Sequence, residues 1–391
     1  MIVSAPTASR PCERFFSKAI GPMHNLDAQT ATAIRDGLAW LAEQQGDDGG
    51  WHSATYGAMR GGAAITALVL YAASCVNEQL RGVHGARWRR GGEFLARGVD
   101  DDGCPRNPDK SVDFPTYAAA LLLLAAPRLK LDLPRAKRQK LVDYLLATQI
   151  ADARGFGPKG PHYGGWDLTG DVRMRGFTTG ANVSVVCFVL EALAAEKTDA
   201  ADAARKDALA WVARCQNLPG ENRASDGGFF FQADRNNDAN KAQWTDERHE
   251  SPRSYGSATA DGLRALVATI GDEEQVRKDE RVVAAAAWLD KHTELTVVPG
   301  FPPPPAADPK TGEVEPFVQW PLALRFYYYA SLARTIGFLP AESRDKRRAE
   351  LRTHVVSLQR NDGRWENEAH HMRENDPLIA TSLALVALAD S

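Results

Sequence analysis

The sequence predicts an all-α protein that folds as an (α/α)6 toroid, a ring of six helical hairpins with an inner and an outer circle of helices. Three observations predict this fold. A turn pattern of Gln, Asp-Gly and an aromatic residue recurs, imperfectly, six times along the 391 residues. An amphipathic segment precedes each copy, and an Ala/Leu-rich apolar segment follows it. Self-similarity of this kind is typical of repeat architectures, in which stacked hairpins share one core.

The turn pattern is clearest in EQQGDDGGW, residues 43–51. Its adjacent acids Asp47 and Asp48 look like a catalytic pair, but the sister segments have Asp-Gly at this point and so predict a turn. We expect the Gln45 amide to bind neighbouring backbone, the glycines to permit the tight reversal and Trp51 to pack on the helix pair. The anchors of the six amphipathic segments are Trp40, Phe94, Tyr144, Trp211, Trp288 and His354.

The apolar segments are hydrophobic nearly all round, so they are expected to form the buried inner helices, while the amphipathic segments fit the outer layer. An open solenoid needs polar caps at its ends, yet the last apolar segment runs to Ser391 without one, which favours a closed ring. We expect an N-terminal tail at 1–25 and a single toroid at 26–391. The inner segments are expected at 63–72, 116–124, 181–193, 258–267, 321–330 and 376–388.

Composition narrows the classes of partner. A formal net charge of −3 gives no reason to expect nucleic acid. Five Cys with no CxxC predict reduced thiols, and His spacing lacks HxxxH and HExxH, so we expect no metal and no cofactor. The sequence contains no run of eighteen apolar residues, so we expect no transmembrane segment. Peripheral membrane contact stays open. The N-terminus lacks a signal-like apolar stretch, so a cytoplasmic location is expected, with export open if a signal was trimmed.

The Gln-x-x-Asp-Gly-x-Trp turns and the helices that follow them resemble the repeats of squalene–hopene cyclases and protein prenyltransferase β subunits, over roughly residues 26–391. The segments Tyr255–Leu263 and Arg281–His292 look most like the stand-alone bacterial group called prenyltransferase/squalene oxidase repeat proteins. The resemblance implies an α/α barrel whose enzymes bind an isoprenoid in the central cavity. However, the cyclases' DxDD acid motif is absent, and the Asp-x-Cys spacing occurs only as Asp102-Gly103-Cys104, where the Asp-Gly pair belongs to the repeat turn, so the resemblance transfers no catalytic residue.

In such a ring the inner helices run parallel and their N-termini meet at one mouth, where unpaired N–H groups favour anions. Charged and aromatic residues near these starts are therefore predicted to bind ligand. Helix capping and solvated rim charges are the alternative explanation. The predicted ligand-binding residues at the mouth are Arg60, Asp113, Arg173, Arg175, Arg253, Tyr255, Trp320, His371 and Arg373.

Four further residues are candidates for the site. Asp261 on an inner helix is expected either to pair with Arg264 or to contact a ligand. Tyr328 belongs to an aromatic run that spans a full turn, so one or two of its rings must face inward. Asp376 and Glu374 are candidate catalytic acids, although Asp376 before Pro377 also fits an N-cap followed by Pro at the first helical position.

These observations support one leading hypothesis and two alternatives. The leading hypothesis is a terpene-cyclase- or prenyltransferase-like toroid that binds an isoprenoid or another apolar small molecule, with catalytic activity not evidenced. The first alternative is a non-catalytic binding or interaction module on the same fold. The second is a polysaccharide-acting (α/α)6 enzyme, which needs two carboxylates in an aromatic-lined cleft. The shape and lining of the central cavity discriminate between them.

Overall fold

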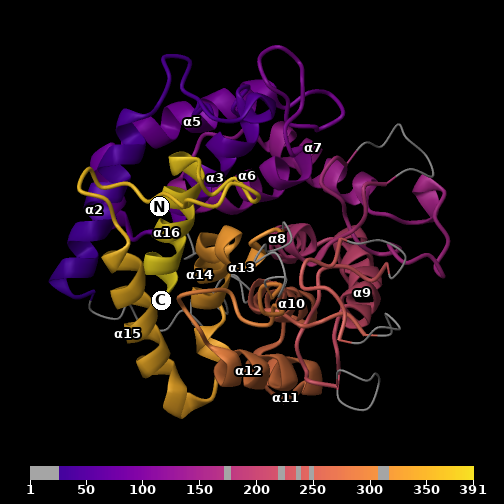
Figure 1. The fold of residues 1–391 in the computed structure, drawn as a ribbon. Coiled ribbons are helices and arrows are strands. Elements are labelled where there is room, and N and C mark those ends of the chain that lie inside the picture. Colours follow the sequence, from indigo (N-terminus) through magenta and orange to yellow (C-terminus); the bar gives the residue numbers. More distant parts are fainter. Residues whose placement is uncertain (1–25, 171–177, 219–224, 235–238, 246–250, 307–316) are drawn as a thin grey trace, which may run out of the picture.

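The computed structural model describes residues 26–170, 178–218, 225–234, 239–245, 251–306 and 317–391. Within these ranges the chain is helical and contains no strand, which confirms the all-α prediction. Figure 1 shows the helices winding around a ring, with the yellow C-terminal helices returning to the indigo α2. Among the described residues, no helix has the length and apolar character needed to cross a bilayer.

In the described parts of the chain, six amphipathic helices form the outer circle and six apolar helices form the inner circle. The outer helices are α2 (Ala28–Glu43), α5 (Gly85–Gly98), α7 (Arg135–Thr148), α9 (Asp199–Arg214), α12 (Glu280–His292) and α15 (Ala341–Ser357). The inner helices are α3 (Ala63–Cys75), α6 (Pro115–Leu129), α8 (Val183–Ala194), α10 (Gly256–Ile270), α14 (Arg325–Ala333) and α16 (Pro377–Asp390). Shorter elements are α4 (Glu78–Arg81), α11 (Glu273–Lys278), α13 (Trp320–Ala323) and the 3-10 turns Gly57–Met59, Gly82–His84, Asp152–Arg154 and Ile336–Phe338.

The ring is closed. Each inner helix packs against the next in chain order, and α16 packs against α3, while α15 lies against α2 in the outer circle. The predicted (α/α)6 toroid is therefore confirmed. Closure removes the exposed apolar end that an open stack would leave at α16, a helix that is buried along almost its whole length.

Four Gln side chains join consecutive repeats in the same way. The Gln45 amide donates to the carbonyl of Gly49 in its own turn and to that of Arg87 in the next outer helix, both at 2.8 Å. Gln149 and Gln216 make the equivalent pair of bonds to α9 and α12. Gln359 donates to Gly363 and, across the closing junction, to Ala33 in α2. The prediction that Gln45 binds backbone is thus confirmed, and its side chain also contacts the neighbouring hairpin.

The aromatic residue of the turn joins the two helices of its own hairpin. The Trp51 indole donates to the carbonyl of Leu41 in α2 at 2.6 Å, and its backbone N–H donates to the Thr66 hydroxyl in α3 at 2.8 Å. Trp365 repeats both contacts, with Val355 in α15 and Thr381 in α16. Asp47 and Asp48 belong to this turn.

The fifth inner helix departs from the sequence prediction. A continuous segment over 321–330 was expected, but the helix is interrupted at Leu324, which separates α13 from α14. The interruption leaves the first amides of α14 without intrahelical acceptors, deep inside the ring. A side chain from the next repeat, Glu374, satisfies two of them.

Candidate functional site

The N-terminal ends of the inner helices surround a cavity of about 460 Å³. All six inner positions contribute to its wall close to where their helices begin, as expected for parallel helices around one mouth. Aliphatic and aromatic side chains dominate the wall, among them Ile65, Leu121, Phe188, Phe231 and Leu383. A concave, mainly apolar site with a few polar groups is the usual form of a small-molecule pocket.

Of the residues that the structure describes, two cations line this cavity. The Lys241 Nζ lies 3.2 Å from the centroid of the Phe231 ring and 5.6 Å from that of Trp320. Burial lowers the pKa of Lys241 to about 7. The Arg373 guanidinium lies 4.8 Å from the centroid of the Phe114 ring. Among the described residues, neither cation has a carboxylate within ion-pair distance of 4.0 Å. They are therefore held by aromatic rings, with charge left to offer to a ligand.

The backbone at the mouth is strained. Phe114 and Arg373, whose side chains stack, both adopt the left-handed region, with φ of 46° and 64°. Such a conformation is unfavourable for residues other than glycine and persists where surrounding structure enforces it, often at binding sites.

Glu374 lines the cavity and is almost fully buried. Its Oε1 accepts the Tyr327 backbone N–H at 2.8 Å, and its Oε2 accepts the Phe326 backbone N–H at 3.0 Å and the Asn367 amide at 2.8 Å. Glu374 thereby caps α14. Burial raises the pKa of Glu374 to about 7, against the lowering effect of these hydrogen bonds and of Arg325. The carboxyl can hold or release a proton near neutral pH at the cavity wall.

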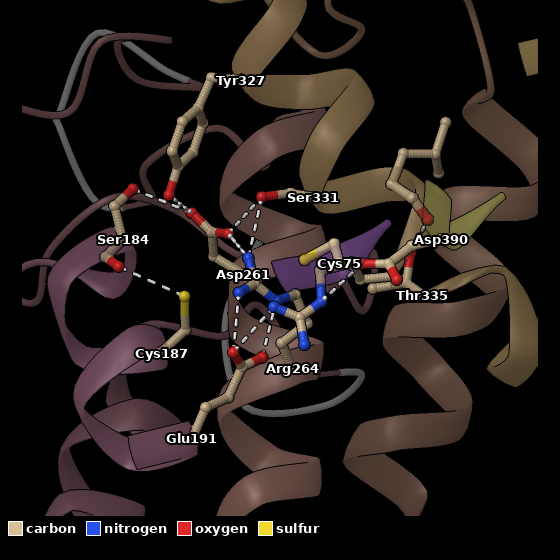
Figure 2. Close-up of polar contacts among 12 residues, drawn as sticks. Cys75, Ser184, Cys187, Glu191, Asp261, Arg264, Tyr327, Ser331, Thr335 and Asp390 are labelled. Atoms are coloured by element: carbon tan, nitrogen blue, oxygen red, sulfur yellow. Dashed lines mark hydrogen bonds and ion pairs between the residues drawn. The ribbon is translucent and has the colours of Figure 1, made fainter. Parts of the chain in front are cut away.

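A buried polar network lies behind the cavity wall (Figure 2). Asp261 in α10 binds Arg264, whose guanidinium also binds the Glu191 carboxylate of α8 through Nε at 2.9 Å and Nη2 at 3.1 Å. Glu191 in turn accepts a bond of 3.0 Å from Arg334, which lies 3.4 Å from Asp390 at the end of α16. These side chains fill the ring beyond the cavity and link four of the inner positions.

Among the predicted mouth residues, Tyr255, His371 and Arg373 line the cavity. Trp320 lies beside it, with its ring centroid 5.8 Å from that of His371. Arg60 is exposed and Arg253 is half-buried, and neither lines the cavity. Arg173 and Arg175 lie outside the described residues.

The acids at the mouth serve helix starts. The Asp113 Oδ1 accepts the Ala64 backbone N–H of α3 at 3.3 Å, and burial raises the pKa of Asp113 to about 6. Asp376 is the N-cap of α16, accepting the Leu378 N–H at 3.0 Å, and it also accepts the Ser53 hydroxyl. Neither the Asp113 nor the Asp376 side chain lines the cavity. Of the two candidate catalytic acids, Asp376 and Glu374, Glu374 is therefore the one that lies on the cavity wall.

Two inner-helix candidates lie away from the cavity surface. Asp261 forms the pair with Arg264 that the sequence suggested and does not itself line the cavity. Tyr328 packs in the core against Gly256, while its neighbour Tyr327 provides the ring that faces the cavity. Sequence reasoning missed Lys241 and Phe231 because both lie in the long segment between α9 and α10, where no helical period indicates which side chains turn inward.

No protein-family model matches the sequence, and a search of curated proteins finds no match. Solved structures with the same fold do exist. The apo type II terpene cyclase MstE from Scytonema has a TM-score of 0.56 at 15% identity, over 92% of this chain and 97% of that chain. A protein from Actinoplanes has a TM-score of 0.56 at 16% identity, over 92% and 99%. A glycosidase has a TM-score of 0.52 at 17% identity, over 94% and 98%.

These similarities define the class of fold. The chain is a terpene-cyclase-like α/α toroid, an architecture that glycosidases share. Other structures of MstE contain geranylgeranyl dihydroxybenzoate as substrate or merosterolic acid A as product. At 15–17% identity the likeness establishes the fold alone, and no activity follows from it.

Proposed function

We propose that the central cavity binds an elongated apolar ligand of isoprenoid type, with an anionic head group between Lys241 and Arg373. The observation that carries this proposal is the combination of an apolar cavity with two cations that lack carboxylate partners among the described residues. An anion there would gain charge-assisted hydrogen bonds and the partial positive charge of converging helix N-termini.

The size of the cavity and the fold support the same ligand class. A volume of about 460 Å³ falls within the roughly 300–1,000 Å³ usual for small-molecule sites. MstE, which has this fold, is a cyclase whose substrate carries a geranylgeranyl chain on a dihydroxybenzoate. An apolar chain along the walls and an acidic head at the mouth would match the distribution of polarity here.

A glycosidase-like activity has less support. Hydrolysis of a glycosidic bond generally requires two carboxyl groups about 5–9.5 Å apart across the substrate. Among the described residues that line the cavity, Glu374 is the one carboxylate.

Native mass spectrometry and thermal shift can test the proposal. The probes are geranylgeranyl diphosphate, geranylgeranyl dihydroxybenzoate, geranylgeraniol and inorganic diphosphate, with maltohexaose as the carbohydrate probe. We expect both geranylgeranyl anions to bind and to stabilise the protein by about 2.7 kcal/mol at a hundredfold excess over Kd. The uncharged alcohol and diphosphate alone should bind more weakly. Absence of binding by both geranylgeranyl anions, or preferential binding of maltohexaose, would contradict the proposal.

A further inference from the structure

We propose that Ser184 and Tyr327 form a second polar subsite on the cavity wall, one that accepts hydrogen bonds and does not donate them. It would select an isoprenoid ligand whose apolar chain carries a hydroxyl group. This inference rests on the proposed function, since it presumes that an isoprenoid enters the cavity. It adds the chemical identity of a second group on the ligand, apart from the head at Lys241 and Arg373.

The subsite is organised by a carboxylate that the ligand does not touch. Asp261 is fully buried, and its Oδ2 receives the Ser184 hydroxyl at 2.9 Å and the Tyr327 hydroxyl at 2.8 Å. Its Oδ1 receives the Ser331 hydroxyl at 2.7 Å and the Arg264 Nη1 at 3.0 Å. Figure 2 shows these groups converging on the Asp261 carboxylate. Ser184 and Tyr327 line the cavity, whereas Asp261, Ser331 and Arg264 lie behind them.

This arrangement fixes the direction of both hydroxyl protons. An ionised carboxylate only accepts hydrogen bonds, and Asp261 forms an ion pair with the Arg264 guanidinium, which is always charged. Each hydroxyl has one proton, so the protons of Ser184 and Tyr327 are both directed to Asp261. The lone pairs of the two oxygens remain for the cavity.

The polarity resists reversal. Turning the Ser184 or Tyr327 proton toward a ligand would remove a donor from a buried carboxylate, and leaving such a group undersatisfied is costly. A ligand hydroxyl can donate to the subsite without any such loss. A ligand ether, epoxide or carbonyl oxygen has no proton to offer and would face other lone pairs.

The test compares farnesyl diphosphate with analogues that carry either a hydroxyl or a methoxy group at the same carbon, placed at the terminal carbon or at one of the branch methyl groups. We expect at least one hydroxyl analogue to bind about three- to tenfold more tightly than farnesyl diphosphate, the gain of one typical hydrogen bond. Its methoxy counterpart should show no gain. Equal affinity of all analogues and farnesyl diphosphate, or an equal gain from the methoxy group, would overturn the inference while leaving the proposed function intact.

Two variants locate the effect. Tyr327→Phe should lose most of the hydroxyl preference, measured as the ratio of the affinities for the hydroxyl analogue and for farnesyl diphosphate. Ser184→Ala provides a second measurement if Tyr327→Phe folds poorly. Tyr328→Phe is the matched control, because Tyr328 is buried one residue away, lies off the cavity and should retain the full preference. An unchanged preference in both Tyr327→Phe and Ser184→Ala would overturn the assignment. If farnesyl diphosphate and every analogue fail to bind, the proposed function falls and takes this inference with it.

Discussion

The two halves of the inner ring use cations in opposite ways. Around the cavity, Lys241 and Arg373 lie against aromatic rings and have no carboxylate partner among the described residues. Beyond the cavity, Arg264 and Arg334 share the Glu191 carboxylate and are further bound by Asp261 and Asp390. Arg264 and Arg334 are buried, whereas Lys241 and Arg373 are half-buried, so the two halves differ in exposure as well as in pairing.

The difference in pairing is reflected in the pKa values of Arg264 and Lys241. Burial would lower the pKa of Arg264, but Cys187, Glu191 and Asp261 together hold it well above its usual value. Burial alone acts on Lys241 and lowers its pKa to about 7. A paired cation is therefore part of the framework, and an unpaired one is available to an anion that enters from outside.

The largest expected effect lies in the paired half. Glu191→Gln leaves Arg264 and Arg334 buried without the charge they share, so we expect the free energy of unfolding to fall by about 3–5 kcal/mol. Urea denaturation measures it. The control is Glu273→Gln, which removes a surface pair with Arg277 on α11 and should cost less than about 1 kcal/mol. Similar losses in the two variants would remove the distinction between framework and surface charges.

In the unpaired half, a substitution should affect binding and leave stability nearly unchanged. Arg373→Gln removes a charged donor at the mouth, so the affinity for geranylgeranyl diphosphate should fall by about 10- to 100-fold, as expected for hydrogen bonds to a charged group. The free energy of unfolding should change by about 1 kcal/mol or less, the scale of the lost cation–π contact with Phe114. Calorimetry measures the affinity. Arg60→Gln, at the same end of the ring but outside the cavity, is the control and should bind normally. An Arg373→Gln protein with normal affinity would place the head group elsewhere.

The smallest effect is a pH dependence of a few fold. Lys241 binds an anion in its protonated form, which predominates below its pKa of about 7 and is lost above it, so affinity should fall between pH 6 and pH 9. Glu374 also has a pKa of about 7. Its carboxyl becomes negatively charged as the pH rises, so it repels an anion at the same cavity wall and also lowers the affinity. Geranylgeranyl dihydroxybenzoate is a suitable probe because its carboxylate is ionised throughout.

Variants separate the two groups. Lys241→Arg stays charged and should leave only the Glu374 part of the pH profile, while Glu374→Gln should leave only the Lys241 part. A profile that neither variant alters would show that other groups control the binding.

The fold could be predicted because its signal is local and repeated. The turn that contains Gln45 and Trp51 has the same contacts in several repeats, so sequence comparison alone indicated hairpins. The N-cap of α16 at Asp376 likewise depends on adjacent residues only.

The site could be predicted only in part because it depends on contacts between repeats. Glu374 gains its role from the interruption of the helix at Leu324, about fifty residues earlier in the chain. Lys241 reaches the cavity from a segment with no period. Which of Tyr327 and Tyr328 faces inward depends on where α14 restarts, a tertiary property that the aromatic run does not encode.

The Gln359 contact with Ala33 has a further consequence for how the chain could be rearranged. It joins the last outer helix to the first with the same two bonds that Gln45 makes between repeats that are consecutive in the chain. The junction between the last and the first repeat therefore has the same Gln hydrogen bonds as the junction at Gln45, although no peptide bond joins these two repeats. We expect a circular permutant that joins α16 to α2 and opens another turn to keep the contacts of Gln359 with Ala33 and Gly363.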